Sequence, residues 1–347
     1  MIHLRAHTIV FALLLCIPAS AQRSPFNGLE VLPADSNGHY RILIGGHFHG
    51  ESTNRSGFPA ATLLANLDTI NALGAHLFLS TGDLYMDARK DSSRYAKAFF
   101  SKLKVPFFNA PGNHDIAGKE SSDPVEFDLP FDPGRRSDTV FYDRILVLNT
   151  EEDGGSLRGD QLGRLQLLSD AIGLRNLFVV SHRPVWAEGD PQYSNLFKDN
   201  TRSYTGTNFH KEVYPVLQGI SKRAQVYWIS GSLGGQAPSS IFFQRHAPNI
   251  TYIQCAIRDL PRDALLIADV GPGGVQWSAL SLTGQELHAP DTYDAAWWRA
   301  QGGRGEAFNW RLLPYEAKKV LTHRAFWWGA AFAIALVLVL RRLYHRW

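Results

Sequence analysis

Cysteine is nearly absent from this chain, which has two among 347 residues. One of them, Cys16, lies in an N-terminal segment that we expect to be removed. Its loss leaves Cys255 without a partner for an intramolecular disulfide. A fold stapled by disulfides is therefore excluded, and stability has to come from a packed core.

Clusters of positive charge are also missing. No block of lysine or arginine occurs in the central region, and the formal net charge is +3. Proteins that bind nucleic acid usually carry such clusters, so a nucleic-acid-binding surface is not indicated. The chain has neither internal repeats nor low-complexity segments. Its 45% apolar and 19% charged residues indicate a globular protein with a sizeable core.

Residues 1–21 have the build of a secretory signal peptide. A basic residue precedes an apolar run at 8–17, and the small residues at 19–21 resemble a cleavage site. An uncleaved membrane anchor is the alternative. We expect export, with a lead segment at 22–39 at the start of the mature chain.

A second apolar run, at 325–340, contains no charged residue and is followed by Arg341 and Arg342. The run is slightly short for a bilayer span, and a buried core helix is the alternative. The Trp327-Trp328 pair at one edge and the arginines at the other favour a transmembrane helix with an aromatic belt and a positive inside face.

Together the two ends predict a single-pass membrane protein. A juxtamembrane connection at 286–324 precedes the membrane helix, and a cytoplasmic tail at 341–347 follows it. The body of the protein, at 40–285, then lies outside the cytoplasm, on the periplasmic side or at the cell surface.

The body begins with alternating strand and helix patterns. Residues 40–44, 75–80 and 105–109 are apolar runs that we expect as buried strands. Between them, 59–73 and 92–103 carry apolar residues at helical spacing. This order predicts a parallel sheet built by right-handed crossovers.

The second half of the body is less regular. We expect a polar surface loop at 115–137, a hairpin at 139–149 that turns at Asp143-Arg144, helices at 158–172 and 209–220, and strands at 177–180 and 226–229. Four short apolar runs follow, at 241–243, 251–254, 265–270 and 275–280. They suggest a second sheet that is rich in antiparallel pairs.

Polar residues suited to metal binding follow four of the expected strands. They are His47 and His49, Asp83, Asn113 and His114, and His182. Singly, each has an ordinary explanation as a core histidine, a helix cap or a turn residue. Because open α/β sheets place their chemistry at the carboxyl ends of strands, we expect these side chains to converge.

The ligand types indicate a particular chemistry. Imidazoles with a carboxylate and a carboxamide suit one or two divalent ions of Mn, Fe or Zn. Such ions hold the oxygens of a phosphate and lower the pKa of a bound water. His114 is placed to stabilise the phosphoryl charge or to protonate the leaving oxygen. We therefore expect a phosphorylated small molecule, lipid or polymer as the partner.

These motifs, HFH at 47–49, GD at 82–83, GNHD at 112–115 and SHRP at 181–184, resemble those of the calcineurin-like metallophosphoesterases. The family pattern is DxH, GD, GNH, H and GHxH. The resemblance covers roughly residues 40 to 285. It implies an α/β fold with two sheets between helix layers, an αββα sandwich, to which this chain adds its C-terminal transmembrane helix.

The resemblance also implies a role for each matching residue. Asp83 is the bridging carboxylate and His49 a ligand of the first metal, while Asn113 and His182 bind the second. His114 is the catalytic histidine that contacts the phosphate. We therefore take His114 and Asp83 as catalytic, Asn113 and His114 as substrate-binding, and assign metal ligation to a set of five residues. That set is His47, His49, Asp83, Asn113 and His182.

Two motifs depart from the family pattern. His47 stands where the family has Asp, which removes a negative charge but leaves an imidazole that can coordinate a transition ion. In the last motif Ser232 stands where GHxH has a ligand of the second metal, and Gly234 stands where it has a ligand of the first. Each ion then has one protein ligand fewer, unless a water, Gln236 or His246 replaces it.

These losses leave different functions open. The first is an exported, membrane-anchored phosphoesterase that hydrolyses a phosphate mono- or diester by metal-activated water. The second is a degenerate family member that binds a phosphorylated ligand or an envelope partner without turnover. A third is a membrane-tethered assembly subunit, which only the topology supports. The presence of Asp83, Asn113 and His114 together favours the enzyme.

Overall fold

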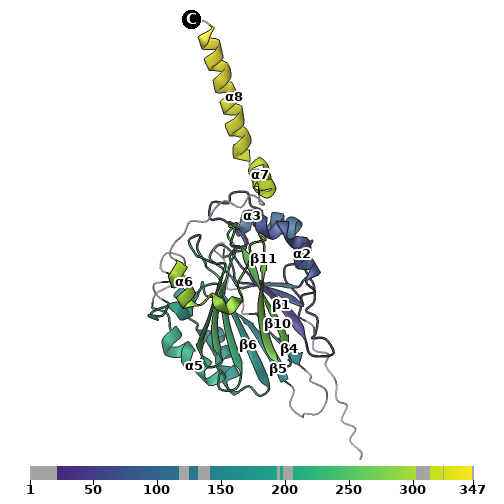
Figure 1. Ribbon diagram of the computed structural model, residues 1–347, viewed down its shortest axis with the longest axis vertical. Helices are drawn as coiled ribbons and strands as arrows, with labels where there is room; N and C mark the ends of the chain where they lie inside the picture. The colour runs from purple at the N-terminus through teal and green to yellow at the C-terminus, as the bar shows by residue number, and fades with distance from the viewer. Residues whose placement is uncertain are drawn as a thin grey trace, which may run out of the picture.

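The structure is a computed structural model (Figure 1). It describes residues 22–116, 125–131, 141–193, 196–197, 206–301, 313–322 and 324–345. The expected signal peptide at 1–21 lies outside these residues and stays a prediction.

The first sheet has five strands in the order β11-β10-β1-β2-β3. These strands are β1 (Tyr40–Gly45), β2 (Leu77–Ser80), β3 (Phe107–Asn109), β10 (Ala264–Gly271) and β11 (Gly274–Ser281). β1, β2 and β3 are parallel to one another, as the alternating pattern predicts. β10 pairs antiparallel with β1 and extends the sheet on its other side.

The second sheet has six strands in the order β4-β5-β6-β7-β9-β8. These are β4 (Val125–Phe131), β5 (Phe141–Val147), β6 (Leu174–Ser181), β7 (Gln225–Ser230), β8 (Ile241–Ala247) and β9 (Ile250–Cys255). The central strands β5, β6, β7 and β9 are parallel, and both edge strands are antiparallel to their neighbours.

Helices cover the outer face of each sheet (Figure 1). α1 (Ala61–Ala65), α2 (Leu67–Ala72) and α3 (Ala88–Tyr95) cover the first sheet, and α4 (Gly159–Leu167) and α5 (Tyr214–Ile220) cover the second. Tighter or wider helical turns extend or connect these elements: η1 (Ala96–Phe100), η2 (Asp153–Gly155), η3 (Leu168–Asp170), η4 (Val185–Ala187) and η5 (Phe209–Val213). The expected αββα sandwich is confirmed.

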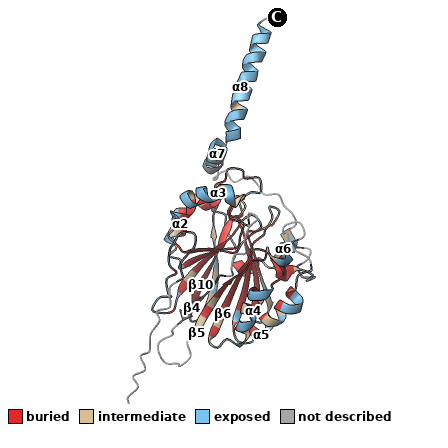
Figure 2. Ribbon diagram, turned by 180° about the vertical axis from the view of Figure 1, so that it is seen from behind, coloured by how far each residue is buried: buried red, intermediate tan, exposed pale blue. Residues whose placement is uncertain are grey.

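Both faces of the first sheet are buried, which explains its uninterrupted apolar runs. Ile42 and Ile44 of β1 point into the core between the sheets, whereas Leu43 packs beneath the helices on the outer face. β2 alternates in the same way. Figure 2 shows the strands buried and the outer surfaces of the helices exposed.

Two predictions for residues 115–149 are wrong. Part of the expected loop is the edge strand β4, whose Pro130 is tolerated because an edge strand pairs on one side only. The expected turn at Asp143-Arg144 is the middle of the continuous strand β5. The buried Asp143 carboxylate is satisfied by the Tyr40 hydroxyl, which donates at 2.7 Å, and by the Arg175 guanidinium.

The grouping of the later strands also differs from expectation. Strands β10 and β11 join the first sheet, while β8 and β9 complete the second. The expected separate antiparallel sheet is therefore wrong. The cause is long-range pairing, since β10 lies beside β1 although more than 200 residues separate their partners in sequence.

The C-terminal part begins with a segment that packs on the body. Within it, η6 (Pro290–Thr292) and α6 (Ala295–Gln301) follow β11, and Trp298 is buried against Phe242. Next come α7 (Leu313–Thr322) and α8 (Arg324–Tyr344). Figures 1 and 2 show α8 projecting from the body and exposed along its length. By length and composition α8 is apolar enough to span a membrane.

Candidate metal centre

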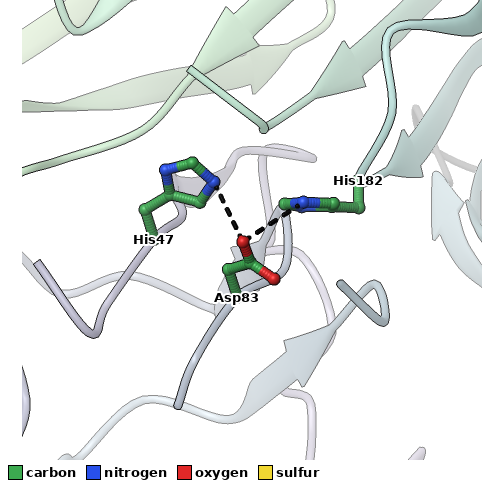
Figure 3. Close-up of side chains that lie close together, drawn as sticks. All are labelled: His47, Asp83 and His182. Atoms are coloured by element: carbon green, nitrogen blue, oxygen red, sulfur yellow. Dashed lines mark ion pairs between the residues drawn. The ribbon is translucent and has the colours of Figure 1, made fainter. Parts of the chain in front are cut away.

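The predicted histidines and aspartate meet at the carboxyl ends of strands from both sheets. The Nε2 atoms of His47 and His182 lie 3.3 and 3.4 Å from Oδ2 of Asp83 (Figure 3). The Nε2 atom of His49 lies 3.8 Å from the same oxygen. All four side chains are buried. We call them the Asp83 cluster.

Several nitrogens of the Asp83 cluster have no hydrogen-bond partner within the described part of the chain. They are both ring nitrogens of His47, both of His49, and Nε2 of His182. Buried polar atoms without partners are rare in proteins, because each one costs free energy. The three Nε2 atoms that face the Asp83 carboxylate fit a divalent cation, whose ligands would be these imidazoles and Asp83.

The protonation states of the cluster suit a metal ion. Burial, together with the charge of Arg258, lowers the pKa of His47 well below its usual value, and burial also lowers the pKa of His49. Both imidazoles are thus neutral, as metal ligands must be. Burial would raise the pKa of Asp83, but His182, His47 and His49 hold it well below its usual range.

His182 differs from His47 and His49 in the direction of its pKa shift. Burial opposes its protonation, but the Asp83 carboxylate outweighs burial and raises the pKa of His182. Its Nδ1 lies 2.8 Å from the carbonyl oxygen of Thr81 and donates to it. This hydrogen bond fixes the ring so that Nε2 faces Asp83, the usual way in which a second partner orients a metal-binding histidine.

His114 lies at the rim of the cluster. Together with His49 and Asp83 it forms a second group of nitrogen and oxygen atoms close enough to hold one ion. It is only partly buried, and its backbone N–H donates to Asp83 Oδ1 at 3.0 Å. Its Nδ1 lies 3.1 Å from the carbonyl oxygen of Met86 and must donate to it. Nε2 therefore remains for proton transfer.

Strained backbone accompanies three of the strand ends. His47, Asp83 and Ser232 have φ values of 54°, 57° and 62°, in the left-handed region that residues other than glycine rarely adopt. Such strain persists where the surroundings enforce it and gathers at functional sites. Gly112, in the neighbouring turn, cannot carry a side chain without a shift of the backbone, because a Cβ there would lie 2.4 Å from the Asp83 backbone nitrogen.

Asp115, the last residue of the GNHD motif, ties the two turns together. Its carboxylate accepts hydrogen bonds from the backbone N–H groups of Asp83, Leu84 and Gly112, at 2.8 to 3.0 Å. The side chain of Asn109 donates to it as well. The sequence feature that could have indicated this role is the position of Asp115 directly after the GNH triplet. Asp115 thus holds Asp83 in position.

Comparison with known proteins agrees with this geometry. Residues 40–205 match the family described as calcineurin-like phosphoesterase. The chain contains a calcineurin-like phosphoesterase domain. The strands that follow this match, β7 to β11, complete both sheets of the domain.

One curated relative, named a probable cyclic nucleotide phosphodiesterase, comes from Moraxella catarrhalis. It is 25% identical over 170 residues, which cover 45% of this chain and 61% of that protein. The chain thus spans about three fifths of the length of that relative.

Solved structures similar to this chain include the following two. One, described as GAP50, the anchor in the inner membrane complex of Plasmodium, has a TM-score of 0.52 and 10% identity. The alignment covers 72% of this chain and 87% of that one, and it shows a shared fold. A dimetal phosphatase from Danio rerio has a TM-score of 0.43 and 16% identity, over 70% of this chain and 99% of that one.

In this phosphoesterase domain the side chain of Asn113 is bonded to an arginine. Its Oδ1 accepts a hydrogen bond of 2.6 Å from Nη2 of Arg183. Nη1 of Arg183 also donates to the hydroxyl of Ser232, at 3.3 Å. The guanidinium is paired with Glu151 through Nε and Nη2, at 2.6 and 2.9 Å. We call Asn113, Glu151, Arg183 and Ser232 the Arg183 cluster.

The altered last motif of the phosphoesterase domain is held by arginines. Besides the bond from Arg183 to Ser232, the side chain of Arg258 donates to the carbonyl oxygen of Leu233 at 2.7 Å. Arg262 donates to the carbonyl oxygen of Gly234 at 2.9 Å. These contacts explain how a turn without the family's histidines keeps its shape.

One of the two residues suggested as replacement ligands, His246, is engaged by other side chains. Both ring nitrogens of His246 are engaged by hydroxyls, Nδ1 with Tyr193 at 2.8 Å and Nε2 with Tyr214 at 3.2 Å. The suggestion that His246 fills the gap is therefore wrong. Gln236 is exposed to solvent.

Proposed function

We propose that this protein is a metal-dependent phosphoesterase that hydrolyses a phosphate mono- or diester. The observation that carries the proposal is the Asp83 cluster, in which three buried imidazoles present unpartnered nitrogens to one carboxylate. Its position at the strand ends of a calcineurin-like phosphoesterase domain supports the same conclusion.

Metal binding and proton transfer are assigned to different residues of the chain. Asp83, His47, His49 and His182 would hold the cation. When bound, such an ion supplies positive charge for the phosphate oxygens and a water of lowered pKa. His114, with Nδ1 fixed on the Met86 carbonyl, would carry a proton at Nε2 to the leaving oxygen.

Two observations bear on the class of substrate. The Moraxella relative is named a probable cyclic nucleotide phosphodiesterase. Arg258, beside the cluster, supplies a cation whose pKa is lowered to about 10 by burial and which stays charged at neutral pH. A phosphodiester is therefore the first substrate to test.

The test is hydrolysis by the full chain, purified in detergent. We expect release of p-nitrophenol from bis(p-nitrophenyl) phosphate with added Mn²⁺, and no release after the metal is removed by a chelator. p-Nitrophenyl phosphate and cyclic AMP serve as the monoester and the cyclic diester. Absence of turnover with Mn²⁺, Fe²⁺ and Zn²⁺ on all three substrates would contradict the proposal.

The location of this activity is a further part of the proposal. The length and apolar composition of α8 support a membrane anchor, and Arg341 and Arg342 support a cytoplasmic C-terminus. With the signal peptide expected at 1–21, the domain would lie outside the cytoplasm. Deleting residues 325–347 should move the protein from the membrane fraction to the soluble fraction. Retention in the membrane would rule out α8 as the anchor.

A further inference from the structure

Arg183 lies between two residues that the family resemblance assigns to a second metal ion. Its Nη2 donates to Asn113 Oδ1 at 2.6 Å, and its Nη1 donates to the Ser232 hydroxyl at 3.3 Å. Asn113 follows β3 and Ser232 follows β7, so the guanidinium bridges strand ends of the two sheets. A second ion would need the same two side chains.

The guanidinium is locked in this place. Its pairing with Glu151 uses two nitrogens in the planar arrangement that suits a carboxylate. The side chains of Arg183 and Glu151 are 5% and 3% exposed, so solvent does not compete for the contact. The Thr150 hydroxyl also accepts from the Arg183 backbone N–H at 2.9 Å. Both the main chain and the side chain of Arg183 are thus held.

We propose that the Arg183 guanidinium stands in place of a second metal ion, so that the domain works with one ion, held in the Asp83 cluster. This inference rests on the proposed function. A divalent ion could not take the side-chain oxygens of Asn113 and Ser232 without displacing the guanidinium from them. Ser232 also offers a neutral hydroxyl where the family pattern has an imidazole.

The division between the two clusters supports one ion. His182, which the resemblance pairs with Asn113, has Nε2 at 3.4 Å from Asp83 and belongs to the group formed with His47. Asn113 itself is engaged by Arg183. The second group, formed by His49, Asp83 and His114, shares the Asp83 carboxylate with the first, so one ion at Asp83 can draw ligands from either group. The oxygens of Asn113 and Ser232 are already occupied by the guanidinium.

The experiment counts metal ions in the full chain, purified in detergent and loaded with Mn²⁺. We expect one ion per chain by elemental analysis, and the electron paramagnetic resonance spectrum of an isolated Mn²⁺. Two ions per chain with a spin-coupled spectrum would overturn this inference but leave the phosphoesterase proposal standing. A count near zero would overturn both.

A double variant tests whether Arg183 excludes the second ion. Arg183→Met combined with Ser232→His removes the cation, frees Glu151 and Asn113, and restores an imidazole. We expect the count to rise from one ion to two. Ser232→His alone, which keeps the guanidinium, should stay at one. If the double variant is folded by circular dichroism and still binds one ion, Arg183 is not the residue that excludes the second.

Arg175→Met is the matched control. Arg175 lies near the start of β6, whereas Arg183 follows the end of that strand. The guanidinium of Arg175 also pairs with a buried carboxylate, that of Asp143. Its removal leaves a comparable unpaired charge far from the strand ends. We expect this variant to lose stability and to keep one ion per chain. Loss of the ion here would show that the count reports general destabilisation.

Discussion

The Asp83 cluster and the Arg183 cluster lie at the same end of the two sheets but use their polar atoms differently. In the Asp83 cluster the imidazole nitrogens approach one carboxylate at 3.3 to 3.8 Å without forming hydrogen bonds. In the Arg183 cluster the guanidinium is already bonded to Glu151, Asn113 and Ser232.

This difference indicates which of the two clusters is suited to bind a ligand. Buried polar groups that are satisfied within the protein need nothing more, whereas buried groups without partners cost free energy until a ligand binds. The Asp83 cluster is thus suited to hold an ion. The Arg183 cluster is an internal ion pair whose role is to shape the site.

The largest expected effect comes from breaking the Asp83 cluster. Asp83→Asn removes the charge that all three buried imidazoles face. Because a bound ion contributes several kcal/mol to stabilising transition-state charge, we expect hydrolysis to fall by about 10³-fold or more. Initial rates with bis(p-nitrophenyl) phosphate measure this. The control is Asp269→Asn, which removes a half-exposed carboxylate from β10. Equal losses in both variants would contradict the assignment.

Breaking the Arg183 cluster should affect stability more than metal binding. Glu151→Gln leaves the buried guanidinium without its counter-charge, and losing one partner of a buried pair costs about 3–5 kcal/mol. Urea denaturation measures this loss. The Mn²⁺ count of the folded variant should stay at one per chain. A variant that unfolds no more easily but loses its ion would reverse the roles of the two clusters.

Metal addition should stabilise the protein through the Asp83 cluster alone. At a free Mn²⁺ concentration of about 100 times Kd, binding to the native state adds about 2.7 kcal/mol to the free energy of unfolding. The midpoint of thermal unfolding should therefore rise in the wild type. It should stay unchanged in Asp83→Asn. An equal rise in that variant would place the ion elsewhere.

The smallest expected effect is the pH dependence of metal affinity. His182 has a raised pKa because it faces Asp83, so below that pKa an ion must displace its proton. Releasing one proton makes the apparent affinity fall by about tenfold for each pH unit below the His182 pKa. The neutral His47 adds no such proton. Calorimetric titration with Mn²⁺ at several values between about pH 5 and 8 measures how the apparent affinity changes with pH. A slope of zero would show that His182 is not a ligand.

Much of the site was predictable because its residues follow strands that are recognisable locally. The apolar runs before His47, Asp83 and Asn113 form the parallel strands β1, β2 and β3 as expected. Parallel strands of one sheet carry their following turns to one edge. The convergence of these turns therefore follows from patterns only a few residues long.

The Arg183 cluster was not predictable in this way. Arg183 appeared only as the residue after His182, and its partners Glu151, Asn113 and Ser232 lie 32, 70 and 49 residues away in sequence. No periodicity links such distant positions. A buried charge also resembles a turn residue when only its neighbours are considered, as the wrong turn at Asp143 shows.

The strand ends, the ligand types at them and the kind of chemistry they indicate can all be inferred from the amino-acid sequence. These follow from hydrophobic periodicity and turn residues, which act over one element at a time. Only the tertiary structure decided that His182 joins His47 on Asp83 and that Asn113 joins Arg183. The reason is that the packing of the two sheets, and not any local pattern, selects which strand-end side chains meet.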